Sequence, residues 1–116
     1  MALVLTEEQT MLRDMAKQFF TEQVPVTNLR QLRDDRDQDG YDKQVWQKIV
    51  ELGFSGILIP EEQGGTGFGP IGLGIVMQEA GRTLAASPLY STAILSAGLI
   101  LAAGSEQQKA ALLPQI

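Results

Sequence analysis

Helix starts and stops divide this chain into short segments. Apolar residues recur at helical spacing after Thr6, after Asp42 and after Pro70, and proline or glycine closes each run. Two capping boxes, TEEQ at residues 6–9 and SEQQ at residues 105–108, mark helix starts, because hydroxyl and glutamine side chains bond to each other's main-chain amides. We therefore predict an all-α fold, an orthogonal bundle of about six helices.

The segment boundaries follow from these signals. The first expected helix begins at residue 6 and ends at Pro25. The others cover Thr27–Arg33, Lys43–Leu52, Pro70 to about Ala86, Leu89–Ala103, and residue 105 to near Pro114. Residues 54–60 are expected to be extended or a brief strand. The first helix is expected to turn one apolar face inward, formed by Met11, Leu12, Met15, Ala16, Phe19 and Phe20.

Composition excludes several classes of protein. The chain has 116 residues, enough for one domain, with no cysteine, no histidine and a net charge of -5. Without thiols or imidazoles, a disulfide framework and the commonest metal sites are excluded. The acidic balance argues against nucleic-acid binding. The opening residues lack the basic start and apolar run of a signal peptide, which favours a cytoplasmic protein.

Charge is distributed unevenly along the chain. After Gln63 the only charged residues are Glu79, Arg82, Glu106 and Lys109. Since an ordinary domain is about 25% charged, this half avoids charge, and we infer that it packs against protein absent from this chain. Its uncharged helix would span about 22 Å, short of the roughly 30 Å of a bilayer core, so we expect a buried helix and no membrane span.

Three motifs suggest sites, but their context argues against each. Residues 35–40, DRDQDG, match half of a calcium loop, yet Trp46 stands where a bidentate glutamate is needed, so we expect no metal site. The G-x-G-x-x-G pattern at residues 67–72 contains Pro70, which has no amide for a phosphate. Glu61 and Glu62 are neighbours on a turn with nothing to raise a pKa, so we expect no catalytic residue.

The ordered set of motifs resembles the N-terminal helical domain of the acyl-CoA dehydrogenases along essentially the whole chain. The motifs are TEEQ at 6–9, Trp46 with LGF at 52–54, PEEQGGTG at 60–67, EAGR at 79–82, GSEQQK at 104–109 and LP at 113–114. No single motif is decisive, but their order is. Tyr41 and Asp42 depart from the family, which often has a proline before the tryptophan-bearing helix.

The resemblance implies a three-part enzyme: a helical domain covering residues 1–116, a β-barrel, and a C-terminal four-helix bundle. In this family FAD lies mainly between the last two domains and a neighbouring subunit, and a glutamate of the C-terminal bundle removes the acyl α-proton. On this reading the barrel and the bundle are absent from this chain, which is inactive alone and binds no FAD. The implied partners are an acyl-CoA substrate, the other domains, and further subunits in a homo- or hetero-oligomer.

The resemblance also implies a substrate-binding surface. In this family the helix after a break like Pro88 forms a wall of the acyl pocket, which by position places Ser87, Ser91, Thr92 and Leu95 against the acyl tail. Small side chains on a buried helix equally fit close packing against a neighbouring helix. An alternative function is a free-standing helical interaction module, and the abrupt end at Ile116 favours the enzyme fragment.

The isolated chain is expected to self-associate through its charge-poor second half, because apolar surface exposed to water favours association. Static light scattering on the purified 116-residue chain measures this directly. A monodisperse monomer would count against the inference of a missing partner.

Overall fold

The structure is a computed structural model that describes residues 4–116, so residues 1–3 lie outside the described part. Its elements are α1 (Glu7–Gln23), α2 (Val26–Asp34), α3 (Lys43–Glu51), η1 (Glu61–Gln63), α4 (Gly69–Arg82), η2 (Tyr90–Ser96), α5 (Ala97–Ala103), α6 (Glu106–Leu112) and η3 (Leu113–Gln115). Residues 4–116 contain no strand. The prediction of an all-α fold with about six helices is confirmed.

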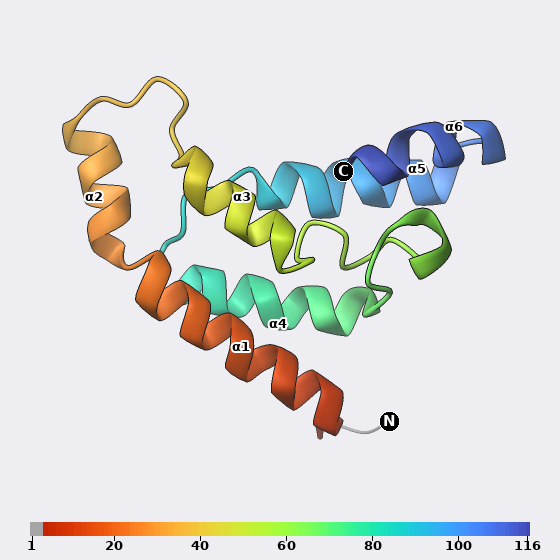
Figure 1. Cartoon of the computed structure of the whole chain (residues 1–116), viewed down its shortest axis with the longest axis horizontal. Helices are drawn as coiled ribbons and strands as arrows, with labels where there is room; N and C mark the ends of the chain where they lie inside the picture. The colour runs from red at the N-terminus through yellow and green to blue at the C-terminus, as the bar shows by residue number, and fades with distance from the viewer. Residues whose placement is uncertain (1–3) are drawn as a thin grey trace.

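Helix α4 packs along α1, and these two helices form the base of the molecule (Figure 1). α2 projects to the left of this view and is joined to α3 by a long loop, while α5 and α6 lie at the opposite end. The main core is drawn from α1, α3, α4, η2 and the loop after α3. Its largest fully buried side chains are Phe20, Ile49, Phe54, Ile57, Val76 and Leu89.

Side-chain caps fix the helix starts as predicted. At α1, Thr6 Oγ1 accepts from the Gln9 amide at 3.1 Å, and Gln9 Oε1 accepts from the Thr6 amide at 3.0 Å. Ser105 and Gln108 make the same reciprocal pair at α6. Asp42 Oδ1 accepts from the Gln44 amide at 2.8 Å at α3. Each cap satisfies amides that the helix cannot pair and contributes about 1 kcal/mol.

The segment between α3 and η1 is folded into turns, so the predicted extended segment or strand at residues 54–60 is wrong. The Ile59 amide donates to the Gly56 carbonyl at 3.0 Å, which curls the chain on itself. Phe54, Ile57 and Ile59 are each 1% exposed. The apolar and β-branched side chains of this segment therefore indicate burial and not a strand. The glycine-rich loop folds back over the segment and supplies its hydrogen bonds.

Helix α4 ends at Arg82 rather than near the predicted Ala86. The Leu84 amide donates to the Gly81 carbonyl and the Ala85 amide donates to the Ala80 carbonyl, the two bonds of a Schellman motif. Leu84 has a φ of 52°, the left-handed conformation that glycine usually supplies at this position. A leucine there gives no stop signal in the sequence, which explains the overlong prediction. After α3, the corresponding left-handed position is a glycine, Gly53, with a φ of 82°.

Gly65→Ala is expected to destabilise the domain by about 2 kcal/mol or more, because a Cβ at this position would collide with the main chain of Ile59. Gly74→Ala is the matched control, since Gly74 lies in α4 with open space around it. The control is expected to gain about 0.5–1 kcal/mol from helix propensity. Urea denaturation followed by far-UV circular dichroism measures both, and equal stabilities would contradict the close approach.

Candidate functional site: the outer face of η2 and α5

The candidate site lies on the helix that follows Pro88. η2 and α5 run into one another without a break, so residues 90–103 form one helical rod. Its inner side is a stripe of small or apolar residues at four-residue spacing: Leu89 is 2% exposed, and Ala93 and Ala97 are fully buried. The two alanines bring the helix backbone close to the core, because they add almost no side-chain bulk.

The outer side of the same rod exposes large apolar side chains. Tyr90 is 55% exposed, Leu95 52% and Leu99 68%. The predicted buried helix is therefore only half right: one side packs inward, and nothing in residues 4–116 covers the other. Exposed leucines on one helix face are typical of a surface that contacts protein or ligand.

The four predicted substrate-binding residues do not all lie on this outer side. Ser91 and Leu95 are exposed and stand four residues apart, whereas Ser87 and Thr92 are half-buried. Tyr90 and Leu99 are also exposed near them, and the uncharged sequence of this helix gave no indication of which side faces outward. In this structure the surface is open.

The hydroxyl groups on this helix are turned toward its own backbone. Ser91 Oγ and Thr92 Oγ1 each donate to the Pro88 carbonyl oxygen at 2.9 Å. Ser87 Oγ accepts from the Leu89 amide at 3.3 Å. Because the Ser91 and Thr92 donors are already engaged, the face presents mainly the apolar carbon of Leu95 and Leu99 to a ligand. It can bind an apolar group, and it offers no general base and no activated nucleophile.

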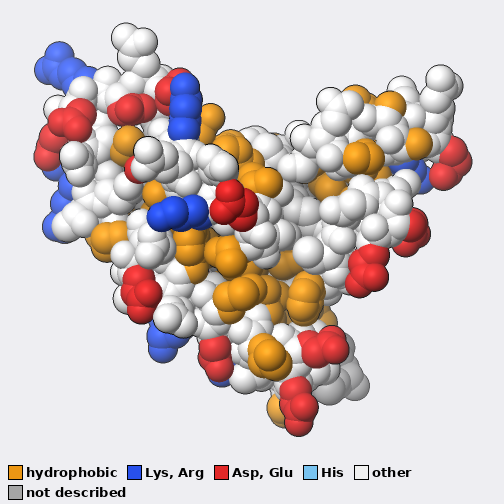
Figure 2. All heavy atoms as spheres, in the orientation of Figure 1, with side chains coloured by type: hydrophobic (Ala, Val, Ile, Leu, Met, Phe, Trp, Pro, Cys, Tyr) orange, Lys and Arg blue, Asp and Glu red, His pale blue; other side chains and the backbone are white. Residues whose placement is uncertain are grey.

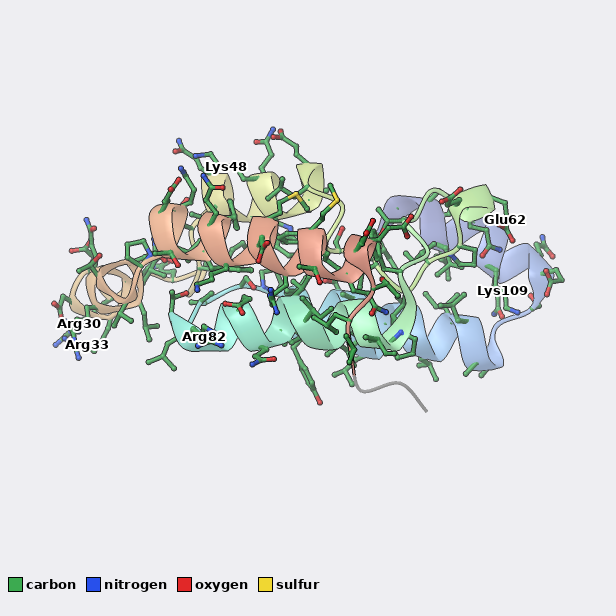
Figure 3. The ribbon with its side chains drawn as sticks, turned by 90° about the horizontal axis from the view of Figure 1, so that it is seen from below. Arg30, Arg33, Lys48, Glu62, Arg82 and Lys109 are labelled. Atoms are coloured by element: carbon green, nitrogen blue, oxygen red, sulfur yellow. The ribbon has the colours of Figure 1, made fainter. Side chains whose placement is uncertain are left out.

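The few charges of the second half lie on α4 and α6. Figure 3 shows Arg82 at the end of α4 and Lys109 on α6, toward opposite ends of the structure. Glu79 is buried, and its Oε2 lies 2.9 Å from Arg82 Nε without hydrogen-bond geometry. The three-residue spacing of this pair on a helix is a structural ion-pair pattern, and we assign it no catalytic role.

The acidic loop between α2 and α3 is held by hydrogen bonds within the loop and by an ion pair to the start of α3. Asp37 Oδ1 accepts from the amides of Asp39 and Gly40, each at 2.9 Å. Asp39 pairs with Lys43 at 3.0 Å, and this hydrogen bond raises the pKa of the Lys43 ammonium. Residues 4–116 hold no cluster of three or more acidic, histidine or cysteine side chains suited to a metal ion.

The glycine-rich loop does not fit a flavin or nucleotide phosphate. The amides of Thr66, Gly67 and Gly69 donate to main-chain carbonyls of residues 56, 59 and 57, at 3.0–3.1 Å. These three amides are hydrogen-bonded within the protein and hold the loop over the buried Ile57–Ile59 turn, whereas a phosphate site needs free amides. The loop is structural.

A second apolar surface lies along α1. Figure 2 shows hydrophobic side chains over the middle of this face, with acidic and basic side chains around its edges. A groove there is lined by Glu8 and by four apolar residues, Met11, Leu12, Met15 and Phe68. Met11 is 71% exposed and Met15 40%, so their predicted place on the inward face of α1 is wrong. The buried stripe is narrower: Leu12, Ala16 and Phe20.

Comparison with known proteins identifies the family. Residues 6–116 match the family model described as acyl-CoA dehydrogenase, N-terminal domain. The chain belongs to this family, as its motifs suggested. Within the described residues, no helix has both the length and the hydropathy to cross a membrane.

Similar proteins come from several bacteria. The chain is 35% identical over 104 residues to the acyl-CoA dehydrogenase IpdE2 of Mycobacterium tuberculosis, covering 88% of this chain and 32% of that protein. It is 34% identical over 108 residues to the probable acyl-CoA dehydrogenase YngJ of Bacillus subtilis, covering 90% and 27%. The fold matches a solved variant of the Tcur3481–Tcur3483 steroid ACAD with a TM-score of 0.82 and 32% identity, covering 95% and 29%.

The chain therefore spans about a third or less of the length of these relatives. The matching region is their helical N-terminal domain. The alternative function predicted from the sequence, a free-standing interaction module, gains no support from these similarities.

Proposed function

We propose that this domain is the N-terminal part of an FAD-dependent acyl-CoA dehydrogenase, which oxidises an acyl-CoA thioester to its α,β-unsaturated form. The family match over residues 6–116 carries this proposal. The proposed role of the domain is to supply one wall of the acyl pocket and a packing surface for the rest of the enzyme.

The outer face of η2 and α5 is the proposed wall. Ser91 and Leu95 are exposed on it, and Ser87 and Thr92 lie half-buried beside them. Fully burying a leucine side chain is worth about 1.5–3 kcal/mol, so covering the exposed half of Leu95 with an acyl chain would contribute about half of this. Inward-turned hydroxyls suit an acyl tail, because they leave no unpaired donor against it.

The catalytic chemistry is proposed to lie in the other domains. None of the described side chains forms an acid–base site, and in the loop that matches a dinucleotide pattern the amides of Gly67 and Gly69 donate to main-chain carbonyls. We propose that a β-barrel and a C-terminal helical domain hold FAD and the base, and that they also cover Tyr90 and Leu99. An oligomer and an acyl-CoA substrate follow from the same proposal.

The proposed activity is tested on the full-length protein. Purified enzyme should show the absorption spectrum of bound flavin and should reduce an artificial electron acceptor only when an acyl-CoA is added. Butyryl-, octanoyl-, palmitoyl- and ring-bearing acyl-CoA thioesters cover the range of acyl sizes. A full-length protein without flavin and without acyl-CoA-dependent turnover would contradict the proposal.

Ser91→Trp in the full-length enzyme is expected to lower kcat/KM for the longest accepted acyl group at least tenfold while sparing the shortest. An indole in place of the exposed hydroxymethyl group fills the volume that a long acyl tail needs. Gln107→Trp on α6 is the control, since this exposed position adds the same indole away from the wall. An unchanged preference for acyl size in Ser91→Trp would remove Ser91 from the wall.

A further inference from the structure

The first half of the proposed wall is not an α-helix. η2 is a π-helical segment, and the Ala97 amide at its end donates to the Thr92 carbonyl, five residues back, as well as to the Ile94 carbonyl. Such widened turns are rare within helices and occur frequently at functional sites. The widened turn lies directly beside Leu95.

The widened turn accounts for the four-residue spacing of the buried residues on the inner side of the rod. Leu89, Ala93 and Ala97 are each four residues apart and all buried. In an α-helix each residue turns about 100°, so two four-residue steps overshoot by about 80°. The wider turn removes this overshoot. One rod can then place Leu89 and Ala93 in the main core and Ala97 in a second cluster with Ile59 and Leu113.

Ser96 makes the side-chain bond that spans the widened turn. Its Oγ donates to the Ser91 carbonyl at 2.8 Å, also five residues back. In a regular α-helix, position 96 would lie within about 20° of the direction of Leu89 and would point into the core. Ser96 is exposed instead. Its hydroxyl therefore stays outside the core and satisfies a carbonyl of the widened turn.

We propose that Ser96 is a positioning residue, whose hydroxyl stabilises the π-helical turn and so sets the direction in which Leu95 and Leu99 face the acyl group. This inference rests on the proposed function of the outer face. Ser96 acts through its neighbours. If the turn relaxed to α-helical geometry, the helix beyond it would rotate by about 100°, which would move Leu99 off the wall.

The test compares Ser96→Val with Ser96→Thr in the full-length enzyme, because these two side chains have the same shape and differ in the hydroxyl. Loss of one hydrogen bond is expected to increase amide hydrogen exchange of residues 92–97 about fivefold in Ser96→Val. The same variant should shift the kcat/KM ratio of the longest to the shortest accepted acyl-CoA about fivefold, through KM. Ser96→Thr should retain the exchange rate and the ratio of the unaltered enzyme.

Two results would overturn the inference. Equal exchange in the two variants would show that the hydroxyl does not hold the turn. Faster exchange in Ser96→Val with an unchanged acyl-size ratio would show that the turn does not position the wall. Failure of the proposed function is distinguishable, because Ser91→Trp would then also leave acyl-size preference unchanged, whereas the difference in exchange would remain.

Discussion

Two buried alanines, Ala93 and Ala97, determine how the second half of this domain is built. Both are fully buried, and because each side chain is a single methyl group, the backbone of the η2–α5 rod lies close to the core. Ala97 packs with Ile59 and Leu113, so this contact joins the segment before the glycine-rich loop to the last helical turn. The large apolar residues Tyr90, Leu95 and Leu99 of the same rod face outward.

That outward face connects the packing of the domain to its proposed function. Tyr90, Leu95 and Leu99 are each more than half exposed, on a chain that spans about a third of the length of the relative IpdE2. Several exposed leucines on one surface favour covering by protein or ligand. The uneven charge distribution of the sequence and the exposed apolar face both fit the proposal that protein or ligand covers this surface in the full-length enzyme.

Most helix positions could be predicted from the sequence, but the side chains that face outward from each helix could not. Helix starts were readable because caps are local: Thr6, Asp42 and Ser105 each bond within three residues. The end of α4 was missed because Leu84 adopts a left-handed conformation without a glycine. Residues 54–60 read as extended because burial and strand propensity favour the same side chains.

The candidate site depended on information that the sequence lacks. The segment from Leu89 to Ile94 has no charged residue to mark a solvent side, and its two small hydroxyl residues, Ser91 and Thr92, bond to the backbone. Periodicity also failed, because the π-helical turn changes the spacing from 3.6 residues to four. Family resemblance supplied the four residues predicted for the wall, and the structure separates them into two exposed and two half-buried positions.

A crystal structure of the full-length protein with a bound, unreactive acyl-CoA analogue tests the central claim most directly. The account predicts that the acyl chain lies in van der Waals contact, within about 4 Å, of Ser91 and Leu95, with the π-helical turn retained. An acyl chain held entirely by other domains, with the outer face of η2 covered by protein or open to water, would contradict it.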